Sequence, residues 1–343
     1  TVLEYLDKVT GEQESKDNLR GQALTMRGWY YFLLVNLYGL PYNYGNPDEN
    51  LGVPLKLQME ITGSYYRRNS VAEVYEQIEK DLLDGINLLE NNPIVMSEYK
   101  INALAAKSIL SRVYLYMENW DGVLRYTNEV LAEKSGLTAL ASADEAAFAW
   151  QGSNAFGVYN MATSNEVIWL YSNVGETSTF YTGGSFNYRA PFGVSDDLMN
   201  LYEFENDATK KNYKDLRPFL YFSSSACFIQ GVAVYYQLYG RKCGKQSLTI
   251  GTKGIRTAEL YLNRAEAYTH KFMASGDDND RKLALSDLNY LRRHRYDTRN
   301  VAYESKDYQD ANDLLEFCKE ERRRELCFED HRWFDLRRYG MPT

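Results

Sequence analysis

The chain has 343 residues, 39 of them basic and 47 acidic, so its formal net charge at neutral pH is −8. This acidic balance excludes a general nucleic-acid-binding protein, because such proteins carry a basic surface that neutralises phosphates. No apolar run approaches about 20 residues, the length of a membrane span. The four cysteines form no C-x-x-C pair and the three histidines stand at no metal-ligand spacing, so we expect no metal and no cofactor.

Two residue types depart from an average composition. Proline accounts for 7 residues, about 2% of the chain against about 5% in average proteins, so long helices can run without interruption. Tyrosine is abundant, with 30 residues against 14 phenylalanines. Because tyrosine is large, stiff and amphipathic, it is common where a protein meets a polar partner. The composition indicates a helix-rich chain with many aromatic side chains, some of them exposed at its surface.

The first helix is predicted over residues 20–38, where one stripe of side chains recurs at helical spacing. Gly39 and Pro41 end this helix. We expect residues 41–69, which are rich in turn-forming and aromatic residues, to form a loop. The predicted stripe consists of Ala23, Arg27, Tyr30, Tyr31, Leu34, Val35 and Tyr38.

The second helix is predicted to begin after Ser70. Ser70 and Glu73 have the spacing of a capping box, in which each side chain satisfies a backbone N–H of the first turn. The sequence Asn91-Asn92-Pro93 ends the helix. Its predicted apolar face consists of Val71, Val74, Tyr75, Ile78, Leu82, Ile86 and Leu89.

Two helical hairpins are predicted, over residues 101–133 and 256–297. In the first, Asn119-Trp120-Asp121 supplies the turn. Each hairpin resembles a tetratricopeptide-type unit of about 34 residues. Such a unit cannot bury its apolar face alone, so we expect the hairpins to stack.

Helical periodicity fades over residues 135–253, which are rich in glycine, serine, asparagine and aromatic residues. Short strands are predicted at Glu166–Tyr171 and Val232–Leu238. Long loops on a rigid scaffold usually carry function.

The predicted fold class is therefore mainly α. We expect a single domain over residues 1–343, in which tetratricopeptide-like hairpins form a solenoid scaffold and a long irregular insertion contains a few short strands. The helical blocks are residues 20–134 and 254–340, and the loop-rich ligand-face insertion is residues 135–253.

Three glutamates, Glu321, Glu325 and Glu329, recur every four residues, as on one face of a helix. A glycosidase could use two of them as acid and nucleophile. The alternative is a ladder of ion pairs, which the sequence favours because a nearby guanidinium lowers a carboxylate pKa and disables it as a general acid. We therefore expect no catalytic residue and no enzyme activity. The expected cationic partners are Arg322, Arg323, Arg324 and Arg332.

The tyrosines divide into two groups. Those on helical stripes are expected in the core, namely Tyr30, Tyr31, Tyr75, Tyr114 and Tyr261. Those in loop-like sequence can present a ring to the C–H face of a sugar, while nearby amides and carboxylates bind its hydroxyls. Some of these loop tyrosines only pin the loops to the scaffold. The candidate ligand-binding residues are Tyr42, Tyr44, Asn46, Asp48, Tyr65, Tyr66, Tyr159, Asn160, Tyr181 and Tyr188.

Cys318 and Cys327 are predicted not to bond to each other. Their separation along a continuous helix corresponds to about 13 Å, whereas a disulfide needs Cα atoms within about 7 Å. Cys227 and Cys243 flank the predicted strand Val232–Leu238, and a bridge between them stays open.

Four segments together resemble the SusD/RagB family of outer-membrane nutrient-binding lipoproteins. They stand in the family's order, and the last is the most specific. One departure is Asp330, where the family usually has glycine. The segments are R-G-x-A-x-x-x-R-x-x-Y-Y-F-x-L-V-x-L-Y-G-x-P-Y at 20–42, R-x-S-V-x-E-V-Y-x-x-I-x-x-D-L at 68–82, R-x-A-E-x-Y-L-x-x-A-E-A at 256–267 and E-R-R-R-E-L-x-F-E-x-H-R-W-F-D-L-R-R at 321–338.

The resemblance implies a non-catalytic glycan-binding protein at the extracellular face of the outer membrane, held by a lipid anchor that this chain does not contain. It implies an oligosaccharide ligand and a partner, a SusC-like TonB-dependent transporter to which the ligand is delivered. Peptide capture by the same scaffold is one alternative, and a helical-repeat adaptor between proteins is another. The sequence leaves open which glycan is bound.

Overall fold

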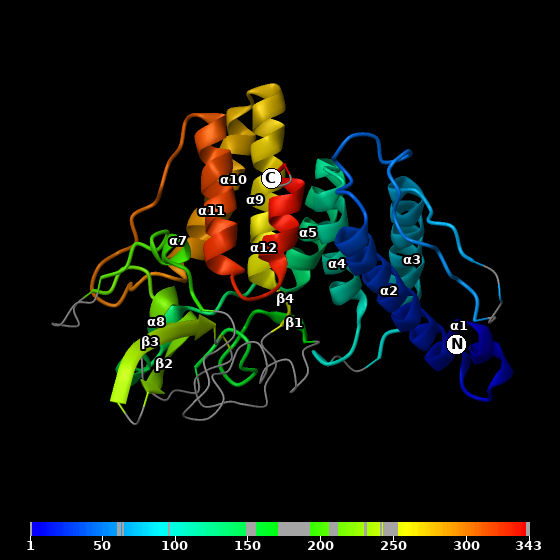
Figure 1. The fold of residues 1–343 in the computed structure, drawn as a ribbon, viewed down its shortest axis with the longest axis horizontal. Coiled ribbons are helices and arrows are strands. Elements are labelled where there is room, and N and C mark those ends of the chain that lie inside the picture. Colours follow the sequence, from blue (N-terminus) through cyan, green and yellow to red (C-terminus); the bar gives the residue numbers. More distant parts are fainter. Residues whose placement is uncertain are drawn as a thin grey trace. The chain divides into compact units, whose positions relative to one another are not determined.

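The structure is a computed structural model that describes residues 2–59, 63, 65–94, 97–148, 156–170, 193–205, 212–229, 232–240, 242 and 253–340. These residues are mostly helical with a few short strands, which confirms the mainly α fold class (Figure 1). The chain divides into two compact units, Thr1–Val130 with Trp333–Thr343, and Leu131–Arg332. The single domain stays a prediction.

The first unit is built on helices that pack against their neighbours in sequence. Helix α2 packs along α3, and α3 packs on α4. Tyr114 of α4 and Tyr126 of α5 stack with ring centroids 5.8 Å apart, which joins the two helices of the first predicted hairpin. The elements are α1 (Val2–Tyr5), a 3-10 helix η1 (Leu6–Lys8), α2 (Gln13–Tyr38), α3 (Val71–Asn91), α4 (Ala103–Tyr116) and α5 (Trp120–Glu133), whose last residues enter the second unit.

Helix α3 forms as the sequence predicts. The Ser70 side chain accepts a hydrogen bond from the Glu73 backbone N–H, and the Glu73 carboxylate accepts one from the Ser70 N–H, so both halves of the capping box are present. Its whole predicted apolar face is buried. Local capping and apolar periodicity therefore agree with the tertiary packing of this helix.

Helix α2 begins at Gln13, seven residues before its predicted start, and its predicted face is only partly correct, because Tyr31 and Val35 are buried while other members of the stripe are exposed. Tyr30 was expected in the core, yet it is 56% exposed, and Leu34 and Tyr38 are exposed with it. Along the first part of α2 the face that meets α3 carries small residues, and towards its end Phe32 meets Tyr75 of α3 edge-on at 6.2 Å. A methyl group added at Gly21 would lie 2.9 Å from a Leu89 side-chain carbon, and one added at Gly85 would lie 2.6 Å from the Thr25 hydroxyl. The backbones approach so closely that large side chains are left on the outer face. The other four tyrosines expected in the core are buried: Tyr31, Tyr75, Tyr114 and Tyr261.

An arginine–aspartate fork joins each of two helix pairs. Arg27 of α2 donates to both carboxylate oxygens of Asp81 on α3, at 2.7 and 2.6 Å. In the second unit, Arg264 of α9 (Thr257–Ser275) binds Asp287 of α10 (Asp278–Arg293) in the same way, at 2.8 and 2.7 Å. Two parallel charge-assisted bonds fix the relative position of the helices. The second hairpin prediction is confirmed by α9 and α10.

The second unit joins these helices to strands and irregular segments. Strand β1 pairs antiparallel with β4, and β2 pairs antiparallel with β3, so the two predicted strands are confirmed and β2 is a strand that the sequence reading missed. Helix α9 also packs on α11. The remaining elements are 3-10 helices η2 (Leu140–Ser142) and η3 (Glu145–Phe148), β1 (Val167–Leu170), α7 (Asp196–Met199), α8 (Arg217–Tyr221), β2 (Phe222–Ile229), β3 (Val232–Gly240), β4 (Gly254–Arg256), α11 (Ala311–Glu325) and α12 (His331–Arg338), which crosses into the first unit.

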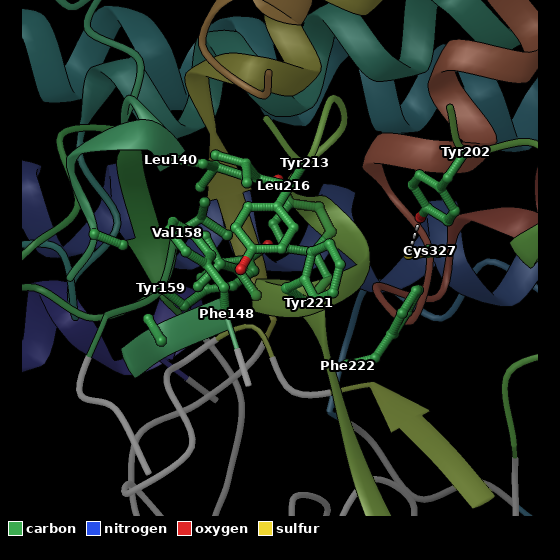
Figure 2. Close-up of a cluster of buried hydrophobic side chains, with 14 of the residues drawn as sticks. Leu140, Phe148, Val158, Tyr159, Tyr202, Tyr213, Leu216, Tyr221, Phe222 and Cys327 are labelled. Carbon is green, nitrogen blue, oxygen red and sulfur yellow. Dashed lines mark hydrogen bonds between the residues drawn. The ribbon is translucent and has the colours of Figure 1, made fainter. Parts of the chain in front are cut away.

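An aromatic core holds the irregular segments of the second unit together (Figure 2). Phe219 meets the Tyr213 ring edge-on at 5.1 Å, and Tyr213 lies 5.5 Å from Phe148. The Tyr202 hydroxyl donates a hydrogen bond to the Arg324 carbonyl and shares a second one with the Cys327 thiol. The described part of the insertion therefore has a packed core of its own.

Helix α11 ends earlier than expected. The sequence reading assumed a continuous helix from Cys318 to Cys327, but α11 stops at Glu325 and a turn follows. Both thiols are free and buried, so the prediction that they do not bond to each other is confirmed. Asp330 closes the turn with a φ of 63°, a left-handed conformation that glycine adopts most easily. The side chains of Cys227 and Cys243 lie outside the described residues.

Candidate functional site

A cluster of buried charges lies inside the second unit, around Glu325 of α11. The two Glu325 carboxylate oxygens accept hydrogen bonds from Arg295 at 3.0 Å, from Arg256 at 2.5 Å and from Arg217 at 3.2 Å. The Tyr221 hydroxyl adds a fourth donor at 2.8 Å. Every one of these side chains is buried. The carboxylate is therefore fully committed to internal partners.

The neighbouring glutamates are held in the same way. Glu321 accepts from Arg217 at 2.6 Å, from Arg292 at 2.7 Å and from Arg324 at 2.9 Å. Burial alone would raise the pKa of Glu321, but these guanidinium groups hold its pKa well below the usual range. Arginines likewise lower the pKa values of Glu325 and Glu329 against the effect of burial. A carboxyl group that stays ionised cannot serve as a general acid.

The ion-pair interpretation of the three glutamates is thus confirmed, but the expected partners need correction. Of the arginines next to them in sequence, Arg324 contacts Glu321. The cations that surround Glu325 and Glu329 come from distant segments. Glu329 lies in the turn after α11, so it does not continue the helical face.

These pairs anchor the insertion to the helices. Glu166, just before β1, binds Arg295 at 2.8 Å and Arg256 at 3.0 Å. Lys242, which follows β3, donates to Glu329 and to the Glu325 carbonyl. The cluster therefore fixes the position of segments that are not held by regular secondary structure.

Tyr159 and Asn160 belong to this interior. Tyr159 is fully buried and donates its hydroxyl to Glu329, while the Arg256 guanidinium lies 5.7 Å from its ring centroid. Asn160 is also buried, and its side-chain oxygen accepts from the Ala162 N–H. Neither offers a face to a ligand, so we leave both out of the proposed site. Tyr181 and Tyr188 lie outside the described residues.

The loop after α2, in the first unit, presents the remaining candidates. Its base is fixed: Arg68 donates to the carbonyls of Tyr38, Leu51 and Gly52 at 2.6–2.9 Å. Arg337 of α12 donates to the Gly39 carbonyl at 2.5 Å. The loop is therefore tied to the helices at both ends.

Tyr44 lies early in this loop, with two hydrogen bonds on its backbone and a half-exposed side chain. Its N–H donates to the Pro41 carbonyl at 3.1 Å, and its carbonyl accepts from the Asn50 side chain at 2.5 Å. The side chain remains 50% exposed. Asn46 accepts from the Asp48 N–H at 3.1 Å, which closes a local turn, and both residues are exposed. These three residues can meet a ligand with little ordering cost.

The other loop tyrosines differ among themselves. Tyr42 packs on Tyr75 with centroids 4.9 Å apart, and burial raises the pKa of its hydroxyl, so it pins the loop to the helices. Tyr65 is fully exposed, and Tyr66 is 46% exposed with the Lys56 ammonium 5.2 Å from its ring centroid. Tyr65 and Tyr66 therefore remain available as aromatic surface.

Two hollows on the described surface were not foreseen from the sequence. One, of about 730 Å³, runs along the outer face of α2 and is mostly apolar. The other, of about 390 Å³, lies in the second unit and is lined by polar groups and two tyrosines. The first is lined largely by residues of the 20–42 segment, namely Ala23, Arg27, Tyr30, Tyr31 and Leu34. The second follows no motif, because its two segments are distant in sequence.

Among the residues that the structure describes, no three histidine, cysteine or carboxylate side chains form a group that could hold a metal ion. Within the same residues, no helix combines the length and the apolar character needed to cross a membrane.

Two protein-family descriptions match the chain. Residues 1–115 match SusD-like_3, described as starch-binding and associating with the outer membrane, and residues 150–343 match SusD_RagB, described as the SusD family. The second match covers more than half of the chain, so the chain belongs to the SusD/RagB family. A search of curated proteins finds no match.

Solved structures share the fold. A SusD-like carbohydrate binding protein from Bacteroides vulgatus ATCC 8482 is 25% identical, with a TM-score of 0.72 over 98% of this chain and 66% of that one. A SusD superfamily protein from Bacteroides thetaiotaomicron VPI-5482 is 22% identical, with a TM-score of 0.71 over 98% of this chain and 71% of that one. The chain thus spans about two thirds of the length of these relatives.

Proposed function

We propose that this protein is a non-catalytic cell-surface receptor that captures oligosaccharides and delivers them to a TonB-dependent outer-membrane transporter. The observation that carries the proposal is the loop after α2, where Tyr44 keeps a half-exposed ring on a backbone held by two hydrogen bonds. A fixed aromatic face suits the C–H face of a sugar ring. The family match and the relative described as carbohydrate binding support the same ligand class.

The proposed site consists of the loop that follows α2. Tyr44 supplies the stacking face, and Asn46 and Asp48 supply hydrogen-bond groups for hydroxyls. Tyr65 and Tyr66, on the returning part of the same loop, supply further aromatic surface. Tyr42 packs on Tyr75 of α3 and so holds the loop against the helix.

The absence of catalysis is proposed on electrostatic grounds. Glycoside hydrolysis needs a carboxylic acid with a raised pKa beside a second carboxylate. The pKa values of Glu321, Glu325 and Glu329 are lowered instead, and all three side chains are buried. Buried, ionised carboxylates can neither reach a glycan nor protonate its leaving group.

The location and partner are proposed from the family. The match described as associating with the outer membrane supports a place at that membrane. The extracellular face and a lipid anchor are part of the proposal through the family resemblance alone. The apolar hollow along α2 favours a protein partner, because large exposed apolar surfaces usually mark interfaces. This observation also favours the second candidate function, an adaptor between proteins. Co-purification with a SusC-like transporter tests the partner.

Substitution of Tyr44 by alanine tests the site. Loss of a central stacking aromatic is expected to cost on the order of 1–3 kcal/mol of binding free energy, roughly a ten- to hundredfold loss of affinity. Isothermal titration with neutral oligosaccharides measures the affinity, and thermal melting reports the stability. Tyr99→Ala is the matched control, because Tyr99 is 67% exposed in the first unit and lies outside the proposed site.

Two outcomes would contradict the site. If Tyr44→Ala binds as tightly as the parent chain, the loop is not part of the site. If the substitution lowers the melting temperature and leaves the affinity unchanged, Tyr44 packs as a structural residue. Binding of peptides but of no glycan would favour the peptide-binding alternative.

A further inference from the structure

The hollow of about 390 Å³ in the second unit has a mixed lining of charged, polar, aromatic and aliphatic residues. Glu203, Asn212 and Lys214 line one side, and the segment that follows α10 from Tyr296 to Asp307 lines the other. Backbone bonds join the segments: the Asp297 N–H donates to the Lys214 carbonyl at 2.7 Å, and Asp215 pairs with Tyr296. The volume falls within the roughly 300–1,000 Å³ of small-molecule sites.

The floor of this pocket is rigid because it rests on the buried charge cluster. Arg292 donates to Glu321 at 2.7 Å on its inner side. On its outer side it donates to the Tyr303 hydroxyl at 3.0 Å and to Glu203 at 3.0 Å, both of which line the pocket. A ligand would therefore meet side chains that are already positioned.

One amide side chain makes three of the hydrogen bonds that hold the wall formed by residues 301–307. The Asn289 side chain donates to the Lys306 carbonyl at 2.9 Å, and its oxygen accepts from the Lys306 N–H at 2.8 Å and from the Tyr303 hydroxyl at 2.9 Å. These three bonds hold an otherwise irregular segment against α10. Preorganisation of this kind is typical of a binding site rather than of a connecting loop.

The pocket groups suit a polyhydroxylated ligand. Tyr296 and Tyr303 meet edge to face at 5.1 Å and supply aromatic surface. Glu203, Ser305 and Lys306 place a carboxylate, a hydroxyl and an ammonium around the same hollow. Sugar hydroxyls both donate and accept, so they can use this mixture of acceptors and donors.

The charges favour a neutral ligand. The charged lining groups are largely paired already: Glu203 with Arg292 and Lys306, Lys214 with Glu205, Asp297 with Arg299, and Asp307 with Arg281. A charged ligand would compete with these pairs, whereas hydroxyl groups can share their remaining lone pairs and protons. Glu304, at the exposed rim, further disfavours an anion.

We propose that this pocket is a second saccharide site that takes a short neutral segment of a glycan and discriminates against acidic sugars. The proposal rests on the proposed function and extends it, because none of these residues belongs to the loop after α2.

Ala302→Trp tests the pocket. Ala302 is an exposed lining residue, so a large side chain there obstructs the hollow without entering the core. Ala274→Trp is the matched control, since Ala274 is equally an exposed residue of the second unit, near the end of α9. The probes are neutral gluco-, xylo-, manno- and galacto-oligosaccharides, with oligogalacturonate as the acidic probe and chitosan oligomers as the cationic one. Titration calorimetry measures each affinity.

We expect the parent chain to bind a neutral probe and not oligogalacturonate, with Ala302→Trp weakening the binding by about tenfold or more and Ala274→Trp leaving it unchanged. A neutral probe that binds equally to the parent and to Ala302→Trp overturns the pocket proposal and leaves the proposed function standing. Preferential binding of either charged probe overturns the assignment of a neutral ligand. If no saccharide binds to the parent chain, both the pocket and the proposed function fail.

Discussion

The buried charge cluster predicts a large difference between two identical substitutions on one helix. Glu325→Gln removes a charge that faces Arg217, Arg256 and Arg295, while Glu320→Gln removes one from a side chain that is 50% exposed and lies 3.2 Å from Arg324. Both changes keep the shape of the side chain and both occur in α11. They differ in burial and in the number of guanidinium groups that lose an ion-pair contact, three for Glu325 and one for Glu320.

The expected magnitudes follow from that difference. Removing one partner of a buried ion pair typically costs about 3–5 kcal/mol, because the remaining charge stays buried without compensation. Arg256 and Arg295 keep Glu166, so the loss is not total, and we expect about 3 kcal/mol for Glu325→Gln. An exposed pair contributes only about 0–1 kcal/mol, which is the expected cost of Glu320→Gln.

Urea denaturation, followed by circular dichroism and by fluorescence, measures both costs as shifts of the midpoint at constant slope. Tyr221→Phe is a milder variant that removes only the hydroxyl 2.8 Å from Glu325, and it should cost about 1.5–3 kcal/mol. Equal midpoints for Glu325→Gln and Glu320→Gln would refute the reasoning, because the cluster would then add nothing to the stability of the unit.

Two further predictions follow from the same carboxylates. The folded-state pKa values of Glu321, Glu325 and Glu329 are lowered. The ionised carboxylates therefore contribute fully to the unfolding free energy above the unfolded-state pKa of about 4.3. This contribution is lost as the pH falls from about 4.3 through the folded-state pKa values. Unfolding free energies that stay constant from neutral pH to about pH 3 would contradict this sign. No glycan that the protein binds should be hydrolysed; reducing-end assays of long incubations check this, and turnover that disappears in Glu325→Gln would overturn it.

The elements that the sequence predicts best are those whose signals are local. The capping box of Ser70 and Glu73 and the apolar periodicity after it act within one helix, so α3 has the predicted start and face. The hairpin of α9 and α10 is equally local, and Gly276 ends α9 with a φ of 72°. Such features depend on neighbouring residues alone.

The features that the sequence missed depend on distant contacts. The packing face of α2 is set by close approach at Gly21 and Gly85, which no pattern of large apolar residues reveals. The partners of Glu325 lie 30 to 108 residues away in sequence. Strand β2 contains three consecutive serines, which are weak strand formers, and it forms because β3 pairs with it.

The candidate site was predicted only in part for the same reason. Loop position alone did not separate Tyr44, whose ring is half-exposed, from Tyr159, whose ring is buried beside Arg256. The pocket lined by Tyr296 and Tyr303 was missed, because its two segments meet only in the folded chain.

Titration of the parent chain with neutral oligosaccharides tests the central claim most directly. The account predicts saturable binding of a neutral glycan, a loss of roughly ten- to hundredfold in affinity for Tyr44→Ala, and unchanged affinity for Tyr99→Ala. No binding of any glycan, with binding of peptides in the same assay, would contradict the account.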